Sequence, residues 1–182
     1  MRFGLLLFAI LIAPIAYADD FASKSLQQGN WFFEVWTGAG KGFTGSTSDT
    51  SLWLAGGRVG KLLTDQLELD MEFVPAFIVF QQETVYGASF TPILLKLNLK
   101  RNGRFVPYLE GGAGILITAS QVPEESSRFN FTPQAGFGVQ VFSNETRAVR
   151  IGARYLHISN GGIAHRNPGI NSLQMLLGFE WF

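Results

Sequence analysis

The fold is decided by the stretch Leu67-Glu68-Leu69-Asp70-Met71-Glu72-Phe73, in which large apolar and acidic residues alternate without a break. Successive side chains of a β-strand point to opposite faces, so one face here is apolar and the other is acidic. The apolar face is expected to continue through Phe77 and Val79. The segment is therefore predicted to be a strand with two chemically different faces.

The same alternation recurs along the rest of the chain, in segments separated by turn residues. Only the segment 51–62 alternates ambiguously. Strands are predicted at 31–40, 51–62, 66–80, 85–100, 105–119, 129–142, 147–159 and 171–182.

The polar face of these strands is rich in glycine and amides and carries both signs of charge. Its charged members are Glu34, Glu68, Asp70, Glu72, Glu110, Glu180, Arg58, Lys96, Arg150 and Arg154. In a soluble sandwich or a lipocalin-like barrel this face would meet water, and that alternative remains open. Small residues and ion pairs better suit the inside of a narrow barrel whose apolar face meets lipid. We therefore predict an all-β fold, an eight-stranded antiparallel up-and-down transmembrane β-barrel.

The connections between the segments favour an outer-membrane barrel. Short turns near 63–65, 101–104 and 143–145 alternate with the longer connections 41–50, 81–84, 120–128 and 160–170. In outer-membrane barrels the short turns and both termini face the periplasm. The chain also ends on an aromatic residue, Phe182. Interfacial belts are expected from the indoles of Trp31, Trp36, Trp53 and Trp181.

The N-terminus has the form of a secretory signal peptide. Arg2 is followed by an apolar run from Phe3 to Ile15 and by Ala16-Tyr17-Ala18, so cleavage is expected after Ala18. The run is too short for a membrane-spanning helix, which leaves 19–182 as the barrel. That part carries 13 Lys and Arg against 14 Asp and Glu, which gives no basic surface for nucleic acid. The chain has no cysteine and therefore no disulfides.

A serine and a histidine lie on the face of segment 147–159 that is predicted to meet lipid. His157 and Ser159 are two residues apart, so they should stand side by side within hydrogen-bond reach. Topology places them at the outer-leaflet end. A polar pair on a lipid-facing wall costs free energy unless it is interfacial and hydrogen-bonded. A histidine that takes a proton from serine is the minimal activated nucleophile, so a lipid substrate explains this placement better than a structural role.

These residues resemble the outer-membrane lipid A 3-O-deacylase family of the PagL type. The matching stretches are His157-Ile158-Ser159-Asn160, Gly161-Gly162-Ile163 and Gly169-Ile170-Asn171-Ser172. The resemblance implies an outer-membrane, eight-stranded esterase that removes the 3-position acyl chain of lipid A without metal or cofactor. It also implies that Ser159 is the nucleophile, His157 the general base, and the backbone around Asn160 and Gly161, with the Asn160 side chain, the oxyanion hole.

Asn171 departs from the family pattern, which has a glutamate at this position. An asparagine carbonyl can accept the histidine Nδ1–H but cannot stabilise imidazolium by charge. Asn171 is expected to orient His157 more weakly than an acid does. Glu180 should face inward, nearer the periplasmic end, and is a poor substitute. Glu124 and Glu125, in a predicted outer loop, remain alternatives, as does loss of the activity.

Three hypotheses follow for function. The first is an esterase acting on lipid A or lipopolysaccharide in the outer leaflet, among outer-membrane lipids. In that case His165 and Arg166 could contact phosphates of the substrate, or they could simply be an exposed loop pair. The second is a non-catalytic barrel that stabilises the membrane or binds a partner, and the third is a phospholipid esterase. The sequence leaves the oligomeric state, monomer or homodimer, open.

Overall fold

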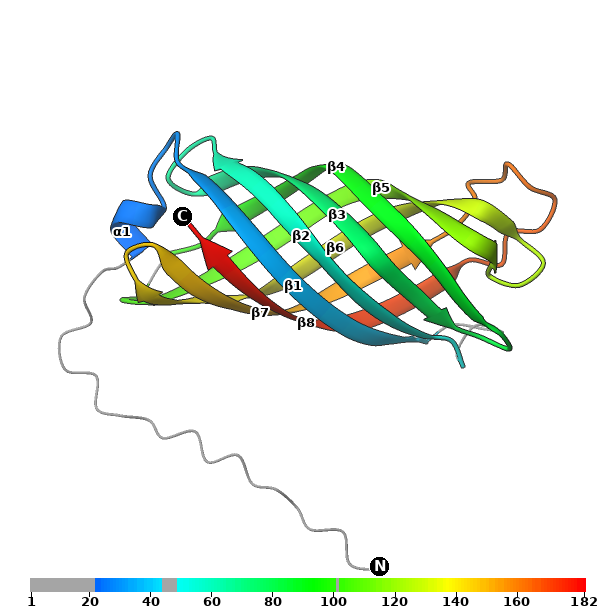
Figure 1. The fold of residues 1–182 in the computed structure, drawn as a ribbon. Coiled ribbons are helices and arrows are strands. Elements are labelled where there is room, and N and C mark those ends of the chain that lie inside the picture. The colour runs from blue at the N-terminus through cyan, green and yellow to red at the C-terminus, as the bar shows by residue number, and fades with distance from the viewer. Residues whose placement is uncertain (1–21, 44–48, 101) are drawn as a thin grey trace, which may run out of the picture.

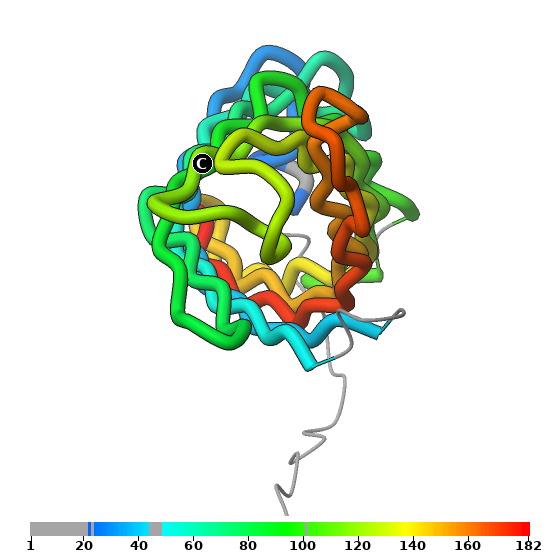
Figure 2. The backbone as a smooth tube through the Cα atoms, turned by 90° about the vertical axis from the view of Figure 1, so that its right-hand side faces the viewer, coloured from blue at the N-terminus to red at the C-terminus, as the bar shows by residue number. Residues whose placement is uncertain are grey.

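The computed structural model describes residues 22–43, 49–100 and 102–182 of the 182-residue chain, and the expected signal peptide lies outside them. A short helix, α1 (Ala22–Ser25), precedes the strands. The strands are β1 (Trp31–Gly42), β2 (Ser51–Leu62), β3 (Leu67–Phe80), β4 (Thr84–Asn98), β5 (Phe105–Val122), β6 (Ser127–Asn144), β7 (Arg147–Ile158) and β8 (Ile170–Trp181). Each pairs antiparallel with its neighbours, and β1 also pairs with β8, so the sheet closes into a barrel (Figures 1 and 2).

This architecture confirms the predicted eight-stranded up-and-down barrel. Both α1 and the C-terminus lie at one end, and we call the opposite end the distal end (Figure 1). One predicted connection is wrong: β5 and β6 extend beyond their expected bounds, and Val122 pairs with Ser127. The expected loop 120–128 is therefore a tight turn over 123–126, and the long distal connections are 43–50 and 159–169.

The alternation of faces holds along most strands but reverses within β3. Leu69, Met71 and Phe73 are exposed on the outer wall, as predicted. Phe77 and Val79, expected on the same wall, are instead buried inside the barrel. The register between β3 and β4 shifts between Val74 and Phe77. An irregularity of this kind changes which residues face inward, and Pro75 within it lacks the N–H that a regular ladder needs.

The interior of the barrel contains three layers. A distal apolar cluster comprises Trp36, Leu52, Leu54, Val74, Phe77, Val79, Val85, Leu116, Val122, Leu156, Ile158, Ile170 and Leu176. A second apolar cluster closes the end near the termini and comprises Ala22, Leu26, Leu62, Val106, Phe142 and Ala148, with Phe182 packed against it. Between them lies the predicted charged face, with all ten of its charged side chains buried. The predicted filling of small residues and ion pairs therefore occupies the middle of the barrel, and large apolar side chains fill both ends instead.

The charged layer is held by ion pairs that cross the barrel. Arg154 donates to both carboxylate oxygens of Glu72 at 3.0 Å and to Glu110 at 2.9 Å. Lys96 lies 2.8 Å from Glu68 and 3.1 Å from Glu180. Buried charges are tolerated only when they are paired and hydrogen-bonded, so this network explains how a narrow barrel can hold so many ionisable groups.

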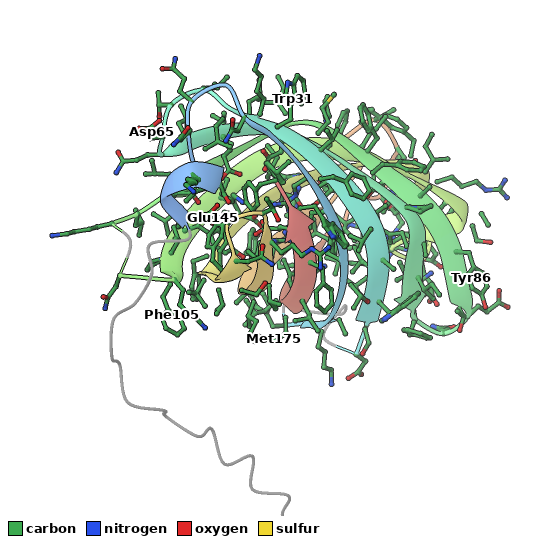
Figure 3. All side chains as sticks on the ribbon, turned by 60° about the vertical axis from the view of Figure 1, so that its left-hand side comes forward. Trp31, Asp65, Tyr86, Phe105, Glu145 and Met175 are labelled. Atoms are coloured by element: carbon green, nitrogen blue, oxygen red, sulfur yellow. The ribbon has the colours of Figure 1, made fainter. Side chains whose placement is uncertain are left out.

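Tryptophans occupy two different environments. Trp31, Trp53 and Trp181 are exposed on the outer wall, as an interfacial belt requires. Trp36 is buried inside the barrel, where the Arg154 guanidinium lies 5.0 Å from its ring. Its predicted place in a belt is therefore wrong. Figure 3 shows Trp31 on the outside of the barrel wall.

The helix α1 was not expected from the sequence. Ala22 and Leu26 bury one side of it in the apolar cluster that closes the barrel. The Nζ of Lys24 lies 2.6 Å from the Glu145 carboxylate in the β6–β7 turn, beside the helix in Figure 3. Within the described ranges, no helix is long and apolar enough to cross a membrane.

Candidate active site

The pairing of β7 with β8 places His157 directly opposite Asn171 at the distal end of the barrel wall. Nδ1 of His157 lies 2.7 Å from Oδ1 of Asn171, a hydrogen bond in which the imidazole N–H donates to the amide oxygen. Both side chains are partly exposed. Their inward neighbours, Leu156, Ile158 and Ile170, are fully or almost fully buried in the distal apolar cluster. The inner side of the wall behind His157 and Asn171 is therefore packed within the apolar core of the barrel.

A second donor, which the sequence analysis missed, reaches the same oxygen. The Tyr155 hydroxyl donates to Oδ1 of Asn171 at 2.5 Å. Tyr155 is 39% exposed, and its ring centroid lies 6.2 Å from that of Phe43 at the end of β1. The sequence could place Tyr155 only on the same face as His157, because the two residues are two positions apart on one strand.

Ser159 lies immediately beyond β7 on the same outer wall. It pairs with Phe131 of β6 through two backbone hydrogen bonds, of 2.7 and 3.1 Å. Phe131 is exposed on the outer wall, and bridge partners point to the same side of a sheet. The residues described include no hydrogen bond between the Ser159 hydroxyl and His157, so the expected contact is absent from this structure. Hydrogen bonds of this kind often tighten only when substrate is bound.

Asn160 anchors the distal loop that follows Ser159. Its side chain is fully buried and donates to the Ser126 hydroxyl at 3.0 Å and to the Arg166 carbonyl at 2.7 Å. Its Oδ1 accepts from the Gly162 N–H at 2.8 Å. Its own backbone N–H donates to the side chain of Asn167 at 3.1 Å. An oxyanion donor at Asn160 would have to give up one of these bonds.

Unlike the donors of Asn160, the backbone N–H of Gly161 is not engaged by the described residues. Gly161 is exposed with a φ of +64°, a conformation that favours glycine. A Cβ added to it would come within 3.0 Å of the Phe131 ring. Of the two predicted oxyanion residues, Gly161 therefore has the available donor.

Gly169 packs against the ring of His157 from the other end of the loop. Its φ is +66°, and an added Cβ would lie 3.1 Å from Cε1 of His157. A larger residue would force the imidazole or the loop to shift. In the sequence Gly169 stands out only as part of the family motif, without a role of its own.

None of the three alternative acids is placed to serve His157. Glu180 is buried near the other end of the barrel, bonded to Lys96 and Gln140. Glu124 accepts from the Gln82 N–H at 2.9 Å, and Glu125 pairs with Arg166. Within the described part of the chain, no carboxylate contacts His157, and no group of three His, Asp or Glu residues could hold a metal ion.

His165 and Arg166 are both exposed in the loop 159–169, but the guanidinium of Arg166 is engaged by Glu125. Arg166 borders a cleft at the distal end whose lining includes neither His165 nor His157 or Ser159. Its lining residues are Asp49, Thr50, Gln81, Gln82, Pro123, Glu124, Glu125, Arg166 and Pro168. A phosphate contact through Arg166 would require the guanidinium to exchange or share its partner.

The family model described as "Lipid A 3-O-deacylase (PagL)" matches residues 23–180, nearly the whole described barrel. The chain belongs to the PagL family. It is also 32% identical, over 77 residues, to the lipid A deacylase PagL of Bordetella bronchiseptica, a match that spans 41% of each protein. As a PagL family member it is an outer-membrane β-barrel.

Solved structures agree on the fold. The outer membrane enzyme PagL superposes with a TM-score of 0.61 at 18% identity and covers 80% of this chain and 97% of that one. Neisserial surface protein A gives a TM-score of 0.64 at 12% identity and covers 83% and 96%. The N-terminal barrel of Pseudomonas aeruginosa OprF gives 0.57 at 16% identity, with 85% and 98% covered. The barrel is thus shared by proteins with different names, so the fold alone does not assign an activity.

Proposed function

We propose that this chain is a serine esterase that hydrolyses an ester-linked acyl chain of lipid A in the outer leaflet. The proposal rests on one observation above all: His157 and Asn171 are hydrogen-bonded at 2.7 Å on the outer wall. Membership of the PagL family supports the same substrate class. An imidazole on a lipid-facing surface can contact its substrate directly if that substrate is itself a lipid.

In this mechanism the Ser159 hydroxyl attacks the ester carbonyl while Nε2 of His157 takes its proton. The Nδ1–H of His157 remains bonded to Asn171 throughout. The tetrahedral intermediate carries its negative charge on the former carbonyl oxygen, which the Gly161 N–H is available to stabilise. When the intermediate collapses, the bond to the sugar oxygen breaks, His157 gives its proton to that oxygen, the sugar leaves with a free hydroxyl, and the acyl group stays on Ser159.

Water then completes the cycle by the same route. His157 takes a proton from water, the resulting hydroxide attacks the acyl-serine carbonyl, and the free fatty acid departs as Ser159 recovers its proton. The acyl chain itself needs no dedicated pocket inside the barrel. It can lie along the outer wall, where Phe131, Leu173 and Met175 are exposed.

The experiment is to express the chain in a host of known lipid A composition and to measure the mass of the extracted lipid A. The expected result is the loss of one hydroxyacyl unit, which disappears when Ser159→Ala is expressed at the same level. No loss with the wild-type chain, or a loss that persists with Ser159→Ala, would reject the esterase. Purified phospholipid as the sole substrate distinguishes a phospholipid esterase from a lipid A esterase.

A non-catalytic barrel is the second candidate, and two observations favour it. Asn171 carries no charge to stabilise imidazolium, and the described residues contain no Ser159–His157 hydrogen bond. This candidate predicts no change in any lipid on expression and full tolerance of His157→Ala.

A further inference from the structure

Two donors converge on one atom at the distal end of the wall, since Oδ1 of Asn171 accepts from the Tyr155 hydroxyl at 2.5 Å and from His157 Nδ1 at 2.7 Å. We propose that Tyr155 is a positioning residue that fixes the Asn171 amide, so that the amide oxygen faces His157. Tyr155 and Asn171 together would then hold His157 in the tautomer that a catalytic acid would otherwise select. The inference rests on the proposed function for its kinetic consequence, but its structural claim can be tested alone.

A neutral amide has an orientation problem that a carboxylate does not have. The two oxygens of a carboxylate are equivalent, so a rotation of the group by half a turn changes nothing. The two ends of an amide differ, one accepting and the other donating. If Asn171 turned its NH₂ group toward His157, Nδ1 would become the acceptor and the proton would move to Nε2. An imidazole in that tautomer cannot take the proton of Ser159 through Nε2.

The distance between the Tyr155 hydroxyl and the Asn171 amide indicates that the amide oxygen, rather than the amide nitrogen, faces Tyr155. An O–H···O hydrogen bond spans about 2.5–3.0 Å, whereas an N–H···O bond spans about 2.7–3.2 Å. At 2.5 Å from the Tyr155 hydroxyl, the Asn171 atom fits the first range and is too close for the second. Rotating the amide would place nitrogen there and force the two side chains apart.

Packing in the surrounding wall resists a separation of the Tyr155 and Asn171 side chains. Tyr155 and His157 come from the same strand, and β7 is paired with β8 through Tyr155–Leu173 and His157–Asn171. The Tyr155 ring packs against Phe43, and Gly169 lies against the His157 ring. The amide is therefore held between two rings whose own positions are fixed by neighbouring packing.

The test is Tyr155→Phe, which removes the hydroxyl and keeps the ring. The protein is the full barrel folded in detergent micelles, with His165→Gln added so that His157 is the only imidazole. In the ¹⁵N spectrum of the unmodified site we expect protonated Nδ1 and unprotonated Nε2 at a pH where the ring is neutral. Tyr155→Phe should give a mixture of both tautomers. Tyr86→Phe, an exposed tyrosine on β4, is the matched control and should change nothing.

The second measurement is the kcat and KM of the variants with lipid A in micelles. Loss of one hydrogen bond worth about 1.4 kcal/mol corresponds to about a tenfold loss of rate, and we expect it in kcat with KM unchanged. In an Asn171→Asp background, Tyr155→Phe should cost less than threefold, because a carboxylate needs no partner to select its orientation. This loss of coupling distinguishes a positioning role from simple packing.

The outcomes separate the two proposals. An unchanged tautomer and unchanged kcat in Tyr155→Phe overturn the role of Tyr155 and leave the esterase intact. A wild-type chain that is inactive on every lipid overturns the esterase, while the tautomer spectrum still decides the role of Tyr155. If Tyr155→Phe does not fold, Tyr155→Leu is used instead, since it also removes the hydroxyl and keeps Asn171. A pure Nδ1–H tautomer in that variant would overturn the proposal.

Discussion

The two faces of β7 carry polar groups under opposite conditions. Arg150 and Arg154 point inward and are buried among carboxylates that they bond at 2.6–3.2 Å. Tyr155 and His157 point outward and share a single neutral amide. The inward groups are balanced by several charged partners each, which suits stability. The outward groups have few partners and, among the described residues, no counter-charge, which suits a site whose remaining partners arrive with a substrate.

The substitution with the largest expected effect changes only a residue on the outward face. Ser159→Ala should lower the deacylation rate by at least about 10³-fold, because the nucleophile of a serine esterase has no substitute. The free energy of unfolding should stay within about 0.5 kcal/mol of wild type, as for other changes of exposed or half-exposed groups. Lipid A mass spectrometry and urea unfolding in detergent measure the two quantities. A comparable loss of stability would contradict the separation of the two faces.

Arg154→Met tests the inward face. It leaves Glu72 and Glu110 short of a partner in the buried layer, and breaking a buried ion pair costs about 3–5 kcal/mol. We expect that loss in the free energy of unfolding measured in urea. The fraction that still folds should retain deacylation that depends on Ser159. Arg147→Met, at the exposed start of β7, is the control and should be nearly neutral.

Asn171→Asp gives the outward face the charge that it lacks. Aspartate keeps the length of asparagine and can stabilise the imidazolium that forms when His157 takes a proton, so kcat should rise by at least about tenfold. Initial rates on lipid A in mixed micelles check this result. A lower rate would mean that the site works better with a neutral residue, contrary to the comparison drawn above.

The smallest effect is expected for Arg166→Gln in the distal loop. Arg166 and Glu125 form an exposed pair, and exposed pairs contribute little to stability, so unfolding should change by less than about 0.5 kcal/mol. If Arg166 also contacts a substrate phosphate, KM for diphosphorylated lipid A should rise about two- to threefold, in the range of a weakened surface contact. An equal KM for lipid A with and without its phosphates would exclude that contact.

Much of the fold could be predicted from the sequence because period-two alternation is a local property. Glu68, Asp70 and Glu72 could be placed inside from their spacing alone, and the strand count followed. Phe77 and Val79 could not, because their direction depends on an irregular register around Pro75 that involves β4. The apolar layer at the distal end was missed for the same reason. An inward leucine and an outward leucine look identical in a barrel sequence.

The candidate site was predictable to the level of the strand face. His157 was expected on the outer wall with Asn171 as its orienting residue, and the two are paired across β7 and β8. The sequence could not indicate that Tyr155 bonds the same amide, since that contact depends on side-chain rotamers. Nor could it indicate that the side-chain donors of Asn160 are engaged, because Ser126 comes from the β5–β6 turn and the Arg166 carbonyl depends on how the loop 159–169 folds back.

The filled interior has a consequence for how such an enzyme would meet its substrate. Because apolar clusters close both ends of the charged layer and Ser159 lies on the outer wall, a lipid substrate would reach Ser159 through the plane of the membrane rather than along the barrel axis. Encounter then depends on lateral diffusion and on the number of substrate molecules per unit area of the leaflet. Diluting lipid A with inert lipid would slow the reaction at constant bulk concentration. For a protein of this shape, the reaction rate would depend on the surface density of lipid A in the leaflet and not on its bulk concentration.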